Sequence, residues 1–403
     1  MRNQQFWLDA ALACTAVFAF CVPWASPIML SPSLSAPHAV GAICAAAVVV
    51  ALATGAELRR GHPLLLPAGA VLLFAAASCL WSIDRTVAVQ STLTLAKNLI
   101  MVWLVFQCCR TAEQLRLVLT CLVLGACSGI ALALWFKVAG LHGQRLRFRP
   151  PGNDPNTFGL TVAMVIPIAL LLARTAAGWR KTGYLAAFAL CLAAVIATAS
   201  RSATLAAAIG VSAVLLSWPG DGARRRAVHF AGVVAVAVVG VAVAPRGATV
   251  RLMAAAHAGA GTALDSRWPL WQAGARVAAD HWLIGTGFGN FGVATLPILM
   301  RDFGRPPVPR AAHNVPLGVA VEGGAVGLGL WAWCAWAVWR LARRLVGPPR
   351  AMWTGVLLAL ATGCQALSWQ CARPLWMAVA LVVAHATLPP DDDPRALVQP
   401  GPH

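Results

Sequence analysis

The sequence contains few charged residues, and very few of them are acidic. Only 11% of its 403 residues are Asp, Glu, Lys or Arg, whereas an ordinary soluble domain has roughly 25%. Hydrophobic residues make up 59% of the chain, and the mean hydropathy is +0.73. This composition excludes a soluble globular domain and indicates an integral membrane protein. The strict apolar and polar alternation of membrane strands is also missing, so we expect an all-α fold.

The sequence also lacks the patterns of metal and nucleotide sites. Its twelve cysteines form no CxxC pair or His/Cys cluster, and most lie within apolar runs as packing residues, so no metal is predicted. The glycine-rich stretch HWLIGTGFGNFG, residues 281–292, has no lysine followed by Ser or Thr, which excludes a P-loop. Its glycines at 285, 287 and 289 are expected to allow a close turn whose amides line an anion site.

Apolar runs predict about twelve transmembrane helices in a single polytopic domain over residues 1–389. The predicted spans are about 9–28, 39–57, 64–81, 87–109, 116–139, 157–173, 183–199, 202–218, 227–245, 313–339, 352–370 and 374–389. The first is expected to be retained, because no small-residue cleavage site follows it. Residues 390–403, with the acidic run DDD, read as a solvated tail.

Basic residues in the short loops predict the orientation. With the N-terminus in the cytoplasm, most of the basic loop residues also lie in the cytoplasm, as does the C-terminal tail. They are Arg59, Arg60, Arg110, Arg116, Arg174, Arg180, Lys181, Arg224, Arg225, Arg226, Arg340, Arg343, Arg344 and Arg350. The segment 246–312, between the ninth and tenth spans, is then external.

Two basic sites break this rule on the external side. The stretch GQRLRFRPPGNDPN, residues 143–156, carries Arg145, Arg147 and Arg149, and Arg201 lies in a very tight turn between two spans. Acidic residues that could pair with them outside are scarce. Because an arginine near a membrane is costly to desolvate, the unmatched charge indicates an anionic ligand on the external face. The alternative is that these side chains reach lipid phosphates.

The external segment predicts a surface helix within residues 264–282. Asp265 or Ser266 is a candidate N-cap, with Pro269 in the first turn. Arg267 would present its cation and nearby backbone amides to a phosphate. The alternative is a simple amphipathic anchor.

Three further ionisable residues stand out. His313 opens a predicted span beside Asn314, and a neutral imidazole at that position is a candidate general base or, alternatively, only a polar anchor. Glu322 and Lys97 lie inside predicted spans. Ionisable groups there deserve a functional hypothesis.

Four ordered pieces of sequence together resemble the superfamily of O-antigen ligases and O-antigen polymerases. They are RFRPPGNDPNTFG (147–159), TASRSATLA (198–206), SRWPLWQAG with HWLIGTGFGNF (266–274 and 281–291) and HNVPLGVAVEGGAVGLGL (313–330). The resemblance implies a helical membrane glycosyltransferase of the GT-C-like type in the bacterial inner membrane. It also implies transfer of a glycan from undecaprenyl pyrophosphate to a sugar hydroxyl on the periplasmic face, without metal or other cofactor.

The same resemblance implies roles for individual residues. Arg201 and Arg267 bind the pyrophosphate, and His313 activates the acceptor hydroxyl. Further substrate-binding candidates are Arg145, Arg147, Arg149, Asn153, Asn156, Asn314 and Glu322. The expected partners are the lipid-linked glycan donor, a lipid A core or glycan acceptor, and membrane lipids, but no nucleic acid.

Three alternatives stay open at this point. A ligase transferring to lipid A core is slightly favoured over a polymerase, which uses the same donor chemistry. A transporter of lipid-linked glycans would be expected to show internal repeats and ionisable groups near the midplane. The ionisable residues gather at one face instead, which favours surface chemistry. A non-catalytic assembly partner that binds acidic glycan is the third possibility.

Overall fold

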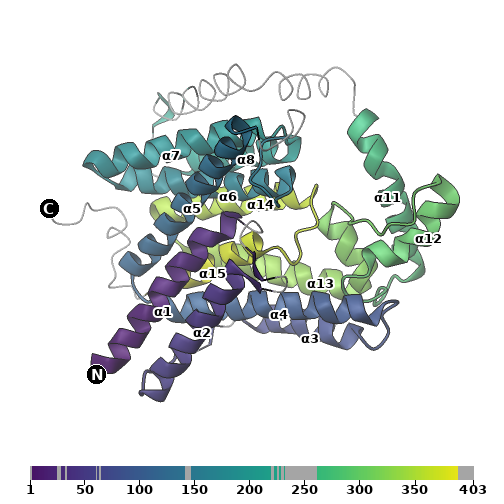
Figure 1. Ribbon diagram of the computed structural model, residues 1–403, viewed down its shortest axis with the longest axis horizontal. Coiled ribbons are helices and arrows are strands. Elements are labelled where there is room, and N and C mark those ends of the chain that lie inside the picture. The colour runs from purple at the N-terminus through teal and green to yellow at the C-terminus, as the bar shows by residue number, and fades with distance from the viewer. Residues whose placement is uncertain are drawn as a thin grey trace.

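The fold is seen in a computed structural model (Figure 1). It describes residues 2–24, 29–31, 34–59, 61–62, 65–140, 147–218, 222–224, 227, 231 and 261–388. Thirteen α-helices, one 3₁₀ turn and one short hairpin make up the secondary structure of this part. The helices are α1 (Arg2–Cys21), α2 (Ala36–Ala53), α3 (Leu65–Ser78), α4 (Arg85–Cys108), α5 (Ala112–Val138), α6 (Pro155–Thr175), α7 (Gly178–Ala197), α8 (Arg201–Ser217), α11 (Gly261–Asp280), α12 (Phe291–Phe303), α13 (Val315–Arg344), α14 (Gly347–Cys364) and α15 (Arg373–Ala386). The 3₁₀ turn is η1 (Val22–Trp24), and β1 (Met29–Ser31) pairs antiparallel with β2 (Leu34–Ser35).

The prediction of a helical membrane protein is confirmed. Six described helices are long and apolar enough to cross a membrane, namely α1, α4, α5, α6, α7 and α13. Shorter apolar helices are found in α2, α3, α8 and α15. Eleven of the predicted spans coincide with one helix each, whereas the predicted span 227–245 lies almost wholly outside the described residues. The total of twelve spans stays a prediction.

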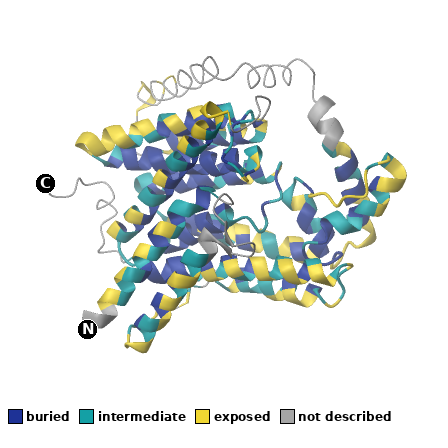
Figure 2. Cartoon of the chain, in the orientation of Figure 1, coloured by how far each residue is buried: buried dark blue, intermediate teal, exposed yellow. Residues whose placement is uncertain are grey.

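The core is built around α6. This helix carries no charged side chain before Arg174, and nearly all of it is buried against α5, α7, α8 and α14. A helix that is apolar all round is expected at the centre of a bundle. Figure 2 shows that exposed residues lie mainly on the outward sides of the surrounding helices. The N-terminal end of α6, capped by Asp154, is therefore firmly placed.

The helices α11 and α12 lie together at one end of the molecule, away from the first turn of α1 (Figure 1). The predicted surface helix exists, but its predicted start was wrong: α11 begins at Gly261, so neither Asp265 nor Ser266 is the N-cap, and Pro269 lies inside the helix. Helix α12 was not predicted from the sequence. It ends at Gly304, whose φ of +56° is the left-handed conformation that closes many helices.

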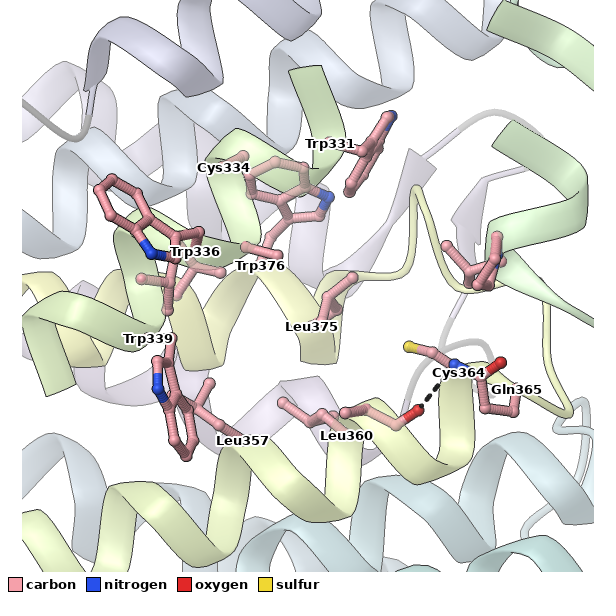
Figure 3. A pocket seen from close by; sticks show the side chains of 16 residues that line it. Trp331, Cys334, Trp336, Trp339, Leu357, Leu360, Cys364, Gln365, Leu375 and Trp376 are labelled. Carbon is pink, nitrogen blue, oxygen red and sulfur yellow. Dashed lines mark hydrogen bonds between the residues drawn. The ribbon is translucent and has the colours of Figure 1, made fainter. Parts of the chain in front are cut away.

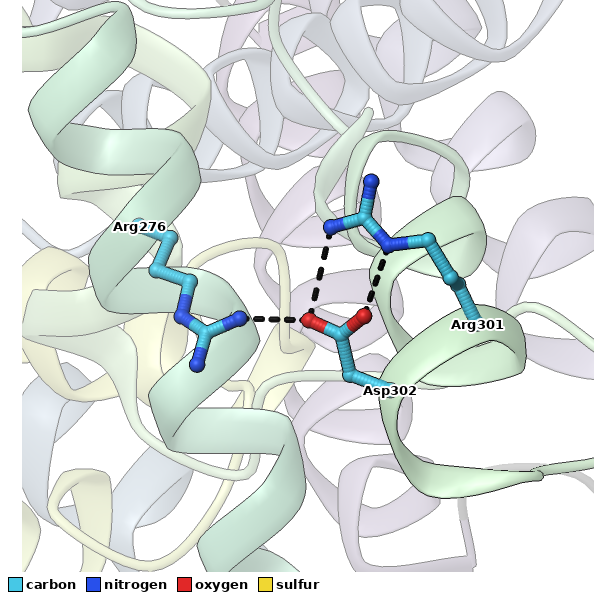
Figure 4. Close-up of polar contacts among 3 residues, drawn as sticks. All are labelled: Arg276, Arg301 and Asp302. Carbon is cyan, nitrogen blue, oxygen red and sulfur yellow. Dashed lines mark hydrogen bonds and ion pairs between the residues drawn. The ribbon is translucent and has the colours of Figure 1, made fainter.

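An ion-pair network joins these two helices (Figure 4). Asp302 of α12 accepts a hydrogen bond of 2.5 Å from Arg276 of α11 and one of 2.6 Å from the neighbouring Arg301. Hydrogen bonding to Arg301, and then to Arg276, lowers the pKa of Asp302. The network is solvent-exposed, so it orients the two helices more than it stabilises them.

Helix α13 is broken at Gly324, which has φ +58° and ψ −154°. The segment 282–287 pairs with the backbone freed by this break: Ala325 donates to the carbonyl of Trp282 at 2.7 Å, and Thr286 donates to that of Val321 at 2.9 Å. Gly285 has φ +68°, and a Cβ there would lie 2.4 Å from the backbone of Glu322. The predicted glycine turn is confirmed, and its function is to clamp the broken helix.

The amides of this turn are used by the protein itself, and that of Gly289 points at the carboxylate of Glu322, so the predicted anion site receives a side chain of the protein rather than a ligand. The amide of Gly285 donates to the carbonyl of His281 at 3.0 Å, and that of Gly287 to Glu322 at 3.0 Å. The amide of Phe288 donates to the Ser78 hydroxyl at 3.0 Å. No row of free amides is left to face a ligand in this part of the chain.

Candidate functional site

Arg201 lies at the sharp turn between α7 and α8. Ser200 is the N-cap of α8, with its hydroxyl accepting a hydrogen bond from the amide of Ala203. The preceding Ala199 has φ +51°, so the chain reverses here within a few residues. The exposed Arg201 is the first residue of the helix. A guanidinium at the positive end of a helix dipole favours a bound anion.

The loop 147–156 is fastened to this turn. Arg147 donates from Nε to the carbonyl of Thr198 at 2.8 Å and from Nη2 to the Asn156 side chain at 3.0 Å. Arg149 donates to the carbonyl of Asn153, whose own side chain is 3% exposed and donates to the carbonyl of Trp24 at 3.1 Å. These four predicted substrate-binding residues thus shape the loop itself.

Asp154 caps α6 at the end of this loop. Its carboxylate accepts hydrogen bonds of 2.9 Å from the amides of Asn156 and Thr157. Of the predicted donor-binding residues in this region, Arg145 lies outside the described residues.

His313 lies just before Asn314, the N-cap of α13. The indole of Trp271 on α11 donates to the carbonyl of Ala312 at 3.1 Å, which holds α11 against the segment leading to His313. His313 has φ +49°, an uncommon conformation for a residue with a side chain, and its amide donates to the Ser368 hydroxyl at 2.8 Å. Nδ1 of its ring is buried without a hydrogen-bond partner among the described residues.

Asn314 connects this segment to the next two helices. Its side-chain oxygen caps α13 by accepting from the amide of Leu317 at 2.8 Å, and its side-chain nitrogen donates to the carbonyl of Gln365 at 3.2 Å. The predicted substrate-binding residue is therefore also the joint between α13 and the end of α14.

The turn before α8 and the segment before α13 contribute to one electrostatic cluster. It is formed by Arg201, Arg267, His313 and Asp154. Burial, followed by the charge of Arg267, lowers the pKa of His313, and Asp154 opposes this. Burial also lowers the pKa of Arg267, which Asp154 raises and Arg201 lowers. The structure therefore brings together the three residues that the resemblance assigned to catalysis. It adds Asp154, for which helix capping is the only signal in the sequence.

The charge of this cluster is not balanced. Neither Arg201 nor Arg267 makes a hydrogen bond or ion pair with a residue that the structure describes. Asp154 is the acidic residue whose charge acts on Arg267. Such groups bind phosphate oxygens in pairs. A neutral imidazole beside them can accept a proton from a hydroxyl.

Glu322 lies apart from this cluster. It is 3% exposed and comes eight residues after Asn314, about 12 Å along the helix at 1.5 Å per residue. Gln370 donates to its Oε1 at 3.5 Å, and the amides of Gly289 and Phe291 point at the carboxylate. Its Oε2 makes no hydrogen bond of normal geometry to the described residues. The structure places Glu322 in the break of α13, and it places Lys97 on the exposed side of α4.

The described residues include no group of three or more His, Cys, Asp or Glu side chains that could hold a metal ion. The expected independence from metal stays a prediction.

These features define a helical membrane protein with two arginines, a histidine and an aspartate clustered at one end. Residues 186–332 match the family model described as O-Antigen ligase, and this match supports the resemblance to O-antigen ligases and polymerases. The matched range contains Arg201, Arg267 and His313, whereas the loop 147–156 precedes it. The domain identifies a glycosyltransferase-type enzyme of lipopolysaccharide biosynthesis, a class that acts on lipid-linked glycans and acceptors. No curated protein matches the chain.

Proposed function

We propose that this protein is an O-antigen ligase that transfers a glycan from undecaprenyl pyrophosphate to a sugar hydroxyl of lipid A core. Transfer would take place on the periplasmic face of the bacterial inner membrane, in a GT-C-like fold of about twelve spans with both termini in the cytoplasm. The observation that carries this proposal is the cluster of Arg201 and Arg267 beside His313. Neither arginine has a hydrogen-bond partner among the described residues.

The arginines act on the leaving group. When the acceptor oxygen attacks the anomeric carbon of the donor sugar, the bond from that carbon to the phosphate oxygen breaks, and its electron pair leaves with the pyrophosphate. The negative charge on the phosphate oxygens grows as this bond breaks. Arg201 and Arg267, placed in advance on two different helices, stabilise that charge more in the transition state than in the bound donor.

His313 acts on the acceptor. Its pKa lies below the ordinary value because of burial and the nearby Arg267, so the imidazole is neutral near pH 7 and available as a base. It takes the proton of the attacking hydroxyl as the new glycosidic bond forms. Asp154 limits this lowering of the pKa and thereby keeps the imidazole basic enough to accept the proton.

The other predicted residues have supporting roles. Arg147, Arg149, Asn153 and Asn156 hold the loop that presents Asp154, as their hydrogen bonds to the protein indicate. We further propose that Arg145 contacts the donor, and that Asn314 places His313 at the start of α13. Glu322 supports the broken helix, because its contacts are with Gln370 and the glycine turn.

The test is glycan transfer by the purified protein in detergent, in the presence of a chelator. The donor is an undecaprenyl-pyrophosphate-linked glycan, offered with lipid A core and, separately, with a second carrier-linked repeat. Product on lipid A core that is lost in His313→Ala supports the ligase. Lengthened carrier-linked chains would instead show a polymerase, and a donor that is bound but never transferred would indicate a transporter or an assembly partner.

A further inference from the structure

An apolar groove with a volume of about 500 Å³ lies between α13, α14 and α15 (Figure 3). Tryptophan rings form much of its wall: Trp331, Trp336 and Trp339 come from α13, and Trp376 comes from α15. Leu360 of α14 lines the facing side. The volume falls within the range of ligand pockets, about 300–1,000 Å³.

One end of the groove adjoins the cationic cluster. Val315 and Pro316 line it, and they directly follow His313 and Asn314 in the chain. Gln365 also lines it, and the carbonyl of this residue accepts the hydrogen bond from the Asn314 side chain. The groove thus begins where the imidazole is placed and leads away from it toward Trp336 and Trp339.

The lining residues select a hydrocarbon chain. Gln365 is the one amide among them, and none carries a charge. Trp336 is 53% exposed, so the far end opens toward the surface that faces lipid. A ligand that fits both ends needs an anionic head for Arg201 and Arg267 and a long apolar chain that continues into the membrane.

We propose that this groove binds the isoprene units of the lipid-linked donor that lie closest to its pyrophosphate. The inference rests on the proposed function, since that function supplies a donor with an anionic head and a polyprenyl chain. By holding the chain, the groove directs the pyrophosphate to the arginines. It thereby contributes to donor affinity without touching the reacting atoms.

Photo-crosslinking tests occupancy directly and does not depend on transfer. The probe is a polyprenyl pyrophosphate with a diazirine in one of its first isoprene units, added to the full-length protein in lipid nanodiscs. We expect adducts on groove residues of α13 and α14, displaced by unlabelled polyprenyl pyrophosphate but not by the same concentration of phosphatidylglycerol. Equal displacement by both lipids would mean that ordinary acyl chains occupy the groove, and the proposal would be refuted.

Filling the groove tests its contribution to turnover. Ala335 and Ala361 line it and are exposed, so Ala335→Phe and Ala361→Phe narrow the groove without overpacking the core. Ala332 is exposed on the same helix as Ala335 but does not line the groove, which makes Ala332→Phe the matched control. Each variant is compared with wild type on a long-chain donor and on a donor whose pyrophosphate carries a methyl group in place of the polyprenyl chain.

We expect kcat/KM for the long-chain donor to fall about ten-fold in the two groove variants, mainly through a higher KM. A loss of this size corresponds to about two methylene groups of the donor that are no longer buried in the groove. Turnover of the methyl donor by the groove variants, and of both donors by the Ala332→Phe control, should change little. An equal loss with both donors, or no loss with either, would refute the groove as a chain site. If wild type transfers neither donor, the proposed function fails, and the crosslinking result still decides what the groove binds.

Discussion

Helix α11 offers a matched pair of arginines for testing the catalytic cluster. Arg267 interacts electrostatically with His313 and Arg201 and makes no hydrogen bond to the described residues. Arg276, on the same helix, is committed to the exposed ion pair with Asp302. Changing each to alanine removes the same side chain from the same helix, but only the first change touches the proposed pyrophosphate site.

The expected magnitude follows from the contact that would be lost. Removing one preorganised donor from a developing negative charge costs about 10²–10³ in kcat. We therefore expect a loss of that size for Arg267→Ala and little change in kcat for Arg276→Ala. Arg267→Lys keeps the charge but not the paired hydrogen bonds of the guanidinium, so its activity should lie in between. Thermal stability should change little in the two Arg267 variants, because no hydrogen bond to the described residues is lost.

The assay measures single-turnover transfer from the undecaprenyl-pyrophosphate-linked donor, with thermal unfolding of each variant in the same detergent. The double variant Arg201→Ala/Arg267→Ala adds a test of cooperation, since two groups that bind one leaving group should give non-additive losses. If Arg267→Ala retained most of the wild-type rate, or if Arg276→Ala lost as much, the assignment of the pyrophosphate to this cluster would be refuted.

Three further predictions concern the surroundings of the cluster. Asp154→Asn keeps a residue that caps helices well but removes the charge that raises the pKa of His313. This pKa should therefore fall further, and the acidic limb of the kcat/KM profile should move to lower pH. An acidic limb that does not move would contradict the role of His313 as the base. Gly285→Ala places a Cβ 2.4 Å from the backbone of Glu322 and should lower the free energy of unfolding by about 1–3 kcal/mol or more, as measured by thermal unfolding. Gly304 also has a positive φ but has open space around it, so Gly304→Ala should lower the free energy of unfolding less. Equal losses would refute the role of the glycine turn in holding the broken helix. Ser368→Ala removes the hydroxyl that accepts the hydrogen bond of the His313 amide, and it should lower kcat with little change in KM. Ser368→Thr keeps a hydroxyl and should restore much of the rate. An unchanged kcat in Ser368→Ala would show that this hydrogen bond does not position the imidazole.

The helical membrane class could be predicted from the sequence alone. Apolar runs of sufficient length must satisfy their backbone hydrogen bonds internally when they enter lipid, so they form helices whatever their neighbours are. Eleven predicted spans accordingly coincide with helices. Arg201, Arg267 and His313 could be proposed as site residues because each lies in a local motif.

The details of the external end could not be predicted in this way. A proline in α11 suggested a helix start, but the helix begins earlier, and local cap signals do not show how far a helix extends. The glycine turn suggested free amides, but the amides of Thr286 and Gly287 bond to α13 some 35 positions further along the chain, and that of Phe288 bonds to Ser78 far before it. Only the folded chain shows which backbone groups remain available to a ligand.

The sequence by itself determined the class of protein, its helices and the residue types able to bind a phosphate or accept a proton, because these depend on local composition and spacing. The tertiary structure decided which of those residues lie together. Asp154 interacts electrostatically with Arg267 and His313, and Glu322 lies at the break of α13. Arg147 and Arg149 form hydrogen bonds within the protein. These outcomes depend on contacts between residues far apart in the chain, and such contacts leave no local pattern.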